Sequence, residues 1–291
     1  MKLNIKDILR LIRPHQYIKN FFIFMPLFFA GQIGNTELLL NVVIAFVAFS
    51  ITASAIYVLN DYHDIEEDKQ HPKKKYRPLA SGSISKSQAI IIMPVLLVVG
   101  STLMLSLSLK AGEILAAYVV MNIAYSFYLK YVAILDVVII AIGFVLRLFI
   151  GSMVTGTSLS MWIVIMTFLL ALFMALGKRR NDVLIYLEAG KKMRKVIGDY
   201  NLQFLDTAMS IMASVVIIAY IIYTITPEIV ARVNSEYLYL TALYVVLGVM
   251  RYLQVSLVLK DSGSPTRVVL KDRFMQLTLI GWVLTFGWIL Y

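Results

Sequence analysis

Long apolar runs recur along this chain and alternate with shorter polar segments. The length of each run is close to the roughly 20 mainly apolar residues that an α-helix needs to cross the hydrocarbon core of a bilayer. Nine such runs lie at residues 17–34, 37–59, 87–108, 112–130, 134–154, 160–177, 206–225, 236–258 and 275–291. The pattern predicts an all-α integral membrane protein with nine transmembrane helices in one polytopic domain, residues 1–291.

Three longer polar segments interrupt the apolar runs, at residues 60–86, 178–205 and 259–274. They follow the second, sixth and eighth predicted helices, so all three emerge on the same side of the membrane. Functional residues gather on loops that a rigid scaffold presents together. We therefore expect the active site among these three segments, under a cap of loops and short helices.

Composition supports the membrane assignment. Hydrophobic residues make up 60% of the 291 positions and charged residues only 15%, which is too little polar surface for a soluble domain of this size. The first 14 residues interleave apolar and basic positions and lack the apolar core of a cleavable signal peptide. Segment 5–13 is instead typical of an amphipathic helix that lies on the membrane surface.

The distribution of basic residues predicts the orientation of the chain. There are 27 Lys and Arg against 17 Asp and Glu, an excess that in a soluble protein could indicate nucleic-acid binding. With a cytoplasmic N-terminus, all basic residues except Lys110, Arg147 and Arg232 fall in cytoplasmic segments, as the positive-inside rule requires. We expect a multi-pass inner (plasma) membrane protein with its C-terminus outside, an active site facing the cytoplasm, and no nucleic-acid partner.

The densest cluster of acids follows the second predicted helix, in Asn60–Asp68. If this helix continues, Asp61, Asp64 and Asp68 share one face, at positions i, i+3 and i+7. Mg²⁺ prefers oxygen ligands and is commonly shared between one or two carboxylates and substrate phosphates. The three aspartates therefore predict a Mg²⁺ site for a phosphorylated substrate. The alternative, a solvated acidic helix end, is disfavoured because acids at a helix C-terminus oppose the macrodipole.

Several cations and amides are candidates for binding phosphate. Arg77 lies in a stiff turn before Pro78 and could bind a phosphate group through two parallel N–H donors. Lys19 and Asn20 lie where the first helix enters the membrane, although Lys19 could equally snorkel to the interface. Arg147 lies within the fifth predicted helix, where a charge must face the interior. Its partner could be lipid phosphate, a helix-end carbonyl or Glu113.

The residues around the aspartates resemble the UbiA superfamily of intramembrane prenyltransferases. Asn60, Asp61, Asp64 and Asp68 match its NDxxDxxxD first motif, and the HPxKKxRPLASG segment at residues 71–82 is also similar. The resemblance implies a nine-helix bundle with a lateral opening for a polyprenyl chain. It also implies that Asp61, Asp64 and Asp68 are catalytic and hold Mg²⁺ on a diphosphate.

Further segments resemble a narrower branch, the decaprenyl-phosphate phosphoribosyltransferases, and together run nearly the full chain. These segments are Arg13–Asn20, Tyr125–Lys130 with Asp136, Gly143–Arg147, Gly177–Arg180, Gly263–Pro265 and Lys271–Arg273. The resemblance implies that the donor is phosphoribosyl diphosphate and the acceptor a polyprenyl phosphate lipid. It also adds Asn60, Tyr125, Lys130 and Asp136 to the substrate-binding candidates.

A second aspartate-rich motif, typical of aromatic prenyltransferases in the superfamily, is replaced here by Gly177–Asp182, which contains three adjacent cations. Lys178 and Arg179, with Asp182, could bind the additional phosphates of phosphoribosyl diphosphate and the lipid, although some of this charge could only set topology. The alternative function is transfer of a polyprenyl group from its diphosphate to an aromatic quinone precursor. A non-catalytic transporter would instead place paired charges at mid-membrane.

Overall fold

The computed structural model describes residues 4–70, 74–189, 195–259 and 265–290. Within these ranges all regular structure is helical, as the hydrophobic pattern predicts. The chain packs as two compact units. Unit 1 comprises Met1–Ile139 and Leu146–Leu159, and unit 2 comprises Ile140–Val145 and Ser160–Tyr291.

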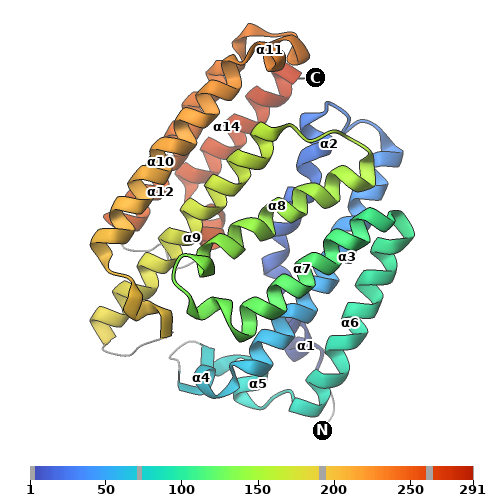
Figure 1. The fold of residues 1–291 in the computed structure, drawn as a ribbon, viewed down its shortest axis with the longest axis vertical. Coiled ribbons are helices and arrows are strands. Elements are labelled where there is room, and N and C mark those ends of the chain that lie inside the picture. Colours follow the sequence, from blue (N-terminus) through green and yellow to red (C-terminus); the bar gives the residue numbers. More distant parts are fainter. Residues whose placement is uncertain (1–3, 71–73, 190–194, 260–264, 291) are drawn as a thin grey trace. The chain divides into compact units, whose positions relative to one another are not determined.

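Unit 1 contains the N-terminal helices and most of α8 (Figure 1). In chain order its elements are α1 (Ile5–Ile12), η1 (Pro14–Phe24), α2 (Met25–Phe29), α3 (Thr36–His63), α4 (Ile65–Gln70), η2 (Lys74–Tyr76), α5 (Pro78–Ser81), α6 (Lys86–Leu107), α7 (Leu109–Phe127), η3 (Leu129–Tyr131) and α8 (Leu135–Thr155).

Unit 2 contains the C-terminal half of the chain. Its elements are α9 (Met161–Ala189), η4 (Lys195–Asp199), α10 (Leu202–Ile225), α11 (Pro227–Val233), η5 (Glu236–Thr241), α12 (Ala242–Leu257), α13 (Pro265–Lys271) and α14 (Arg273–Leu290).

Seven helical segments of the described residues are long and apolar enough to span a membrane, so the chain is a multi-pass membrane protein. Two of the nine predicted spans do not meet these criteria. The first, 17–34, is divided between the 3₁₀ helix η1 and the short helix α2. The fourth, 112–130, largely overlaps α7, in which Lys110, Glu113 and Asn122 lower the mean hydropathy.

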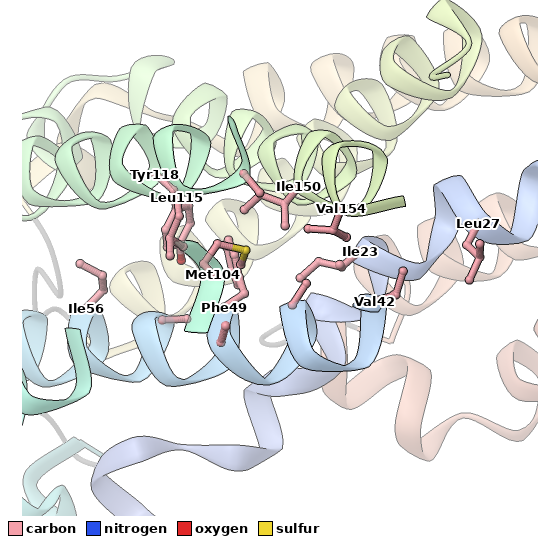
Figure 2. Packing of buried hydrophobic residues seen from close by; sticks show 14 residues of the cluster. Ile23, Leu27, Val42, Phe49, Ile56, Met104, Leu115, Tyr118, Ile150 and Val154 are labelled. Atoms are coloured by element: carbon pink, nitrogen blue, oxygen red, sulfur yellow. The ribbon is translucent and has the colours of Figure 1, made fainter. Parts of the chain in front are cut away.

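Helix α3 forms the centre of unit 1. The side chain of Asn35 caps its N-terminus by accepting hydrogen bonds from the N–H groups of Glu37 and Leu38. Its buried side chains meet those of η1, α6, α7 and α8 in one hydrophobic cluster (Figure 2). The rings of Phe49 and Tyr118, with centroids 4.6 Å apart, form part of this cluster. Burial of this apolar face positions the C-terminal end of α3, which bears the aspartates.

A smaller hydrophobic cluster lies around the C-terminal end of α3. It joins α1, α3, α4, α5 and the start of α6 through Leu11, Val58, Ile65, Leu79, Ile84 and Ala89. Leu79 immediately follows the Arg77–Pro78 turn, and Ile65 lies between Asp64 and Asp68. Packing of these apolar side chains therefore fixes the backbone that carries the acidic motif and its basic neighbours.

In unit 2, α9 continues well beyond the predicted end of its membrane span at residue 177. Lys178, Arg179 and Asp182 thus lie on a helix, whereas the polar pattern predicted a loop from residue 178. The buried Arg180 explains the continuation, because it pairs with Asp206 of α10 and donates to the carbonyl oxygen of Ser256 of α12 at 2.7 Å. These contacts favour continuation of the helix, because a helical backbone at this point directs the Arg180 side chain toward α10 and α12.

Helices α3 and α6 approach closely at Gly100. A Cβ atom there would lie 2.2 Å from the Thr52 hydroxyl and 2.7 Å from the carbonyl oxygen of Ala48. We expect Gly100→Ala to lower the free energy of unfolding by about 1–3 kcal/mol, the usual cost of overpacking. Thermal melting in detergent measures the effect. Gly34→Ala is the matched control, since a Cβ at Gly34 meets nothing within 4 Å; equal melting temperatures for the two variants would contradict close α3–α6 packing.

Candidate active site

Asp61 is a buried acid of the site, with 2% of its surface exposed in the last turn of α3. Arg13 and Arg77 both donate hydrogen bonds to its Oδ1 atom, Arg77 at 2.9 Å. Its Oδ2 atom is buried and has no hydrogen-bond partner among the described residues. Because an unsatisfied buried carboxylate oxygen is costly, Oδ2 is a suitable ligand for a cation.

Arg77 connects two of the three aspartates. Its Nη1 atom donates to Asp61 and also to Asp68 Oδ2 at 2.6 Å. Asp68 is 2% exposed, and its Oδ1 atom lies 3.7 Å from the Lys74 ammonium. Arg77 has the extended backbone that residues before proline prefer. Pro78 follows it at the first position of α5. The stiff turn expected from the sequence thus presents Arg77 to both acids.

Asp64 marks a break in the acidic helix. It is the C-cap of α3, and α4 begins at Ile65, so the three aspartates come from two helices and their junction rather than from one continuous face. Its Oδ1 atom accepts a hydrogen bond from Lys130 at 2.6 Å and lies 3.1 Å from His63 Nδ1. Burial alone would raise the pKa of Asp64, but the hydrogen bonds from Lys130 and His63 bring this pKa below its ordinary value. Asp64 is therefore ionised at neutral pH.

The segment after α7 supplies Lys130, which is only 6% exposed. It is anchored one turn earlier by Ser126, which donates to the Oδ1 atom of Asn60. Ile134, at the end of this segment, has a φ of 71°, a strained value for a β-branched residue. The substrate-binding candidates Tyr125 and Asp136 flank the same segment, Tyr125 half-buried on α7 and Asp136 fully buried in the first turn of α8.

Four cations therefore surround the three aspartates in unit 1: Arg13, Lys74, Arg77 and Lys130. In the part of the chain that the structure describes, no three His, Cys, Asp or Glu side chains converge closely enough to hold a metal ion by themselves. Mg²⁺ commonly uses one or two carboxylates and completes its coordination with water and phosphate. The arrangement suits a metal ion that binds together with a phosphorylated ligand.

A second polar cluster is buried deeper in unit 1, around Arg147, which is 5% exposed. Its Nε atom donates to Asn20 Oδ1 at 2.9 Å, and its Nη2 atom lies 3.5 Å from the Tyr118 hydroxyl. The guanidinium group also lies over the rings of Phe49 and Tyr118, 4.6 and 5.2 Å from their centroids. Glu113, which the sequence offered as a structural partner for Arg147, is exposed on α7.

Lys19 is half-buried and directly precedes Asn20 on η1, so it lies beside the same cluster. The structure thus unites Lys19, Asn20 and Arg147, which were separate candidates in the sequence. Two residues that contact candidate residues, Arg13 and Tyr118, are not singled out by the sequence. Arg13 was interpreted mainly as orienting charge, although its position before Pro14, within a segment similar to the phosphoribosyltransferase branch, was an available signal. Tyr118 carried no distinguishing signal.

The remaining candidates lie on α9 in unit 2. Arg179 is 1% exposed, and its Nη1 atom donates to Asp182 Oδ2 at 2.8 Å, one helical turn along. Lys178 is half-buried beside it. Two of the predicted phosphate-binding candidates, Arg179 and Asp182, therefore form an ion pair on one helix face.

Comparisons with known proteins agree with this architecture. The sequence matches the UbiA prenyltransferase family over residues 20–288. Decaprenyl-phosphate phosphoribosyltransferase from Mycolicibacterium smegmatis is 28% identical over 300 residues, covering 99% of this chain and 93% of the relative. The protein of the same name from Corynebacterium glutamicum is 28% identical over 285 residues, covering 96% and 86%.

The fold is similar to that of a solved UbiA homologue from Archaeoglobus fulgidus bound to DMAPP and Mg²⁺. The TM-score is 0.72 at 17% sequence identity, and the alignment covers 97% of this chain and 98% of the homologue. At this identity the likeness concerns the fold alone. The family resemblance inferred from the NDxxDxxxD motif is confirmed by the family match over residues 20–288: the chain belongs to the UbiA prenyltransferase family.

Proposed function

We propose that this protein transfers the 5-phosphoribosyl group from phosphoribosyl diphosphate to a polyprenyl phosphate of the decaprenyl type and releases diphosphate. The observation that carries the proposal is the cluster of three aspartates surrounded by Arg13, Lys74, Arg77 and Lys130. Acids hold a metal ion while the cations bind phosphate, and both are needed when donor and acceptor are anions. Similarity to decaprenyl-phosphate phosphoribosyltransferases over nearly the whole chain supports the same substrates.

Asp61, Asp64 and Asp68 would hold Mg²⁺, and the unsatisfied Oδ2 atom of Asp61 fits this role. Bound Mg²⁺ would stabilise the charge on the departing diphosphate. Arg77 and Lys130 hold Asp61, Asp68 and Asp64 at fixed orientations, and their remaining N–H groups are donors for phosphate oxygens. These residues therefore fix the donor before the reaction begins.

The acceptor phosphate would be bound by Lys19, Asn20 and Arg147. A phosphate monoester is already anionic at neutral pH, so it can attack the ribose C1 without a general base. The main task of the protein is then to hold two anions close together in the correct orientation, which lowers the entropic barrier. Tyr118 and Phe49 support Arg147 through ring contacts and preorganise this cation.

We propose for the chain the membrane topology that its sequence predicts. η1 with α2, and α7, would complete nine membrane-crossing segments of a single membrane domain, with the N-terminus and the aspartates at the cytoplasmic face of the inner membrane. The basic residues of segments 60–86, 178–205 and 259–274 support this orientation. Asn60, Tyr125 and Asp136 in unit 1, and Lys178, Arg179 and Asp182 in unit 2, remain candidate substrate contacts.

A two-substrate assay tests the reaction against the alternative of aromatic prenyl transfer. Purified protein receives phosphoribosyl diphosphate labelled in the ribose, Mg²⁺ and either polyprenyl phosphate or polyprenyl diphosphate with 4-hydroxybenzoate. We expect ribose label in the organic phase only with polyprenyl phosphate. Formation of prenylated 4-hydroxybenzoate, with no label transfer, would establish the alternative instead.

Replacing Asp61 by Asn tests the metal assignment. The substitution keeps the side-chain size but removes the charge that would face the metal ion, so we expect turnover to fall by about 100-fold or more, the scale seen when one preorganised electrostatic group is lost. Glu67→Gln is the matched control, because Glu67 is an exposed acid on the neighbouring helix α4. Unchanged turnover of the Asp61→Asn variant would remove Asp61 from the metal site.

Arg147→Met tests the acceptor site. Loss of a charge-assisted hydrogen bond, worth about 1.5–3 kcal/mol, should raise the KM for polyprenyl phosphate by about 10- to 100-fold and leave the KM for phosphoribosyl diphosphate nearly unchanged. Lys19→Met should act in the same direction, and it serves as the second variant if Arg147→Met fails to fold. Equal effects on both KM values would argue against a separate acceptor site.

A further inference from the structure

Helix α1 exposes an apolar surface beside a basic one. Around the helical wheel, Ile5 and Leu9 adjoin each other and are 72% and 49% exposed. Lys6 and Arg10 form the neighbouring stripe, and both are exposed; Arg10 lies 3.9 Å from Asp7, its one acidic neighbour on the helix. An apolar stripe bordered by basic residues is the pattern of helices that lie in the interface of an anionic bilayer.

The opposite side of α1 faces the protein. Leu11 is fully buried and belongs to the hydrophobic cluster with Val58 of α3 and Leu79 of α5. The protein therefore covers only part of the apolar surface of the helix, and Ile5 and Leu9 are left outside that cluster. The polypeptide then turns at Arg13 into the apolar segment η1, so α1 lies directly before the chain enters the membrane.

Eight residues are too few for a stable helix in water, where isolated helices shorter than about 12–15 residues are marginal. The Asn4 cap and the burial of Leu11 supply part of the necessary stabilisation. Contact of Ile5 and Leu9 with lipid, together with attraction of Lys6 and Arg10 to anionic headgroups, would supply more. Order in α1 is therefore expected to depend on the lipid.

The end of α1 reaches the acidic motif. Arg13 is the C-cap of the helix: its backbone N–H donates to the carbonyl oxygen of Leu9, and its φ of 53° lies in the left-handed region. This conformation directs the guanidinium group over the ring of Tyr57 and onto Asp61 Oδ1. When α1 frays, the Arg13 turn is lost, and among the described residues Asp61 then keeps Arg77 alone to orient its carboxylate.

We propose that α1 docks on the anionic surface of the bilayer through Ile5, Leu9, Lys6 and Arg10, and that docking strengthens metal–diphosphate binding by holding Arg13 on Asp61. Arg13 occupies Oδ1 and leaves Oδ2 unsatisfied. Arg13 thus acts as a positioning residue that turns the free oxygen toward the ligand. The second half of this inference rests on the proposed metal site, whereas the docking itself does not.

Docking is measured in the full chain with a single reporter, which is feasible because the sequence contains no cysteine. Leu9→Cys is labelled with an environment-sensitive fluorophore and placed in nanodiscs of phosphatidylcholine with or without phosphatidylglycerol. We expect quenching by a spin-labelled lipid to increase in the anionic discs, and Lys6→Gln with Arg10→Gln to abolish the increase. The matched pair Lys69→Gln with Lys75→Gln removes two exposed charges outside α1 and should preserve it.

Coupling to the site is measured in the same nanodiscs without turnover, from the rise in melting temperature with Mg²⁺ and inorganic diphosphate. We expect the apparent affinity to be about fivefold or more higher in anionic discs, the lower range of allosteric coupling, and this gain to disappear in the Lys6, Arg10 double variant and in Arg13→Gln.

The outcomes separate the parts of the inference. Equal quenching in both lipids, or no effect of the double variant on quenching, overturns docking. Lipid-dependent quenching with equal affinities overturns the coupling. If Mg²⁺ and diphosphate raise the melting temperature of neither the unmodified protein nor its variants in either lipid, the proposed metal site itself fails, whatever the reporter at position 9 shows.

Discussion

The buried carboxylate of Asp61 is the constraint on which the architecture of unit 1 depends. A charge at the end of an apolar helix requires compensating charge and hydrogen bonds, since desolvation penalises it heavily. Arg13, which precedes α3 in the chain, and Arg77, which follows it, provide both the charge and the hydrogen bonds. The contacts of Asp61 therefore join the segment before the first apolar run, the end of α3 and the turn before α5.

The cost of burying charge also explains why the neighbouring acids, Asp64 and Asp68, pair with cations. Asp68 shares Arg77 with Asp61, and Asp64 pairs with Lys130. These pairs relieve repulsion among three carboxylates in the free protein. The donors are also groups that bind phosphate, so the residues that stabilise the free site can serve an anionic ligand. A site of this kind suits a reaction between two phosphorylated substrates, one of them a lipid, within a UbiA fold.

A second buried charge in unit 1, that of Arg147, is also stabilised by its contacts. Arg147 is buried among Asn20, Tyr118 and Phe49, so a formal charge is accommodated through amide, hydroxyl and ring contacts. Ring contacts of this kind stabilise a guanidinium group. The proposed acceptor site uses this buried guanidinium group together with the ammonium group of Lys19.

The sequence by itself determined the membrane class, the family and the identity of the acidic motif, because hydrophobic run length, charge placement and motif spacing are local properties. Packing decided the rest. The break at Asp64 and the continuation of α9 past Lys178 reflect tertiary contacts that override local polarity. The pairs Arg13–Asp61, Lys130–Asp64 and Arg147–Asn20 join residues 48, 66 and 127 positions apart. Which cation meets which acid or amide depends on how the helices pack, and periodicity carries no information about such distant partners.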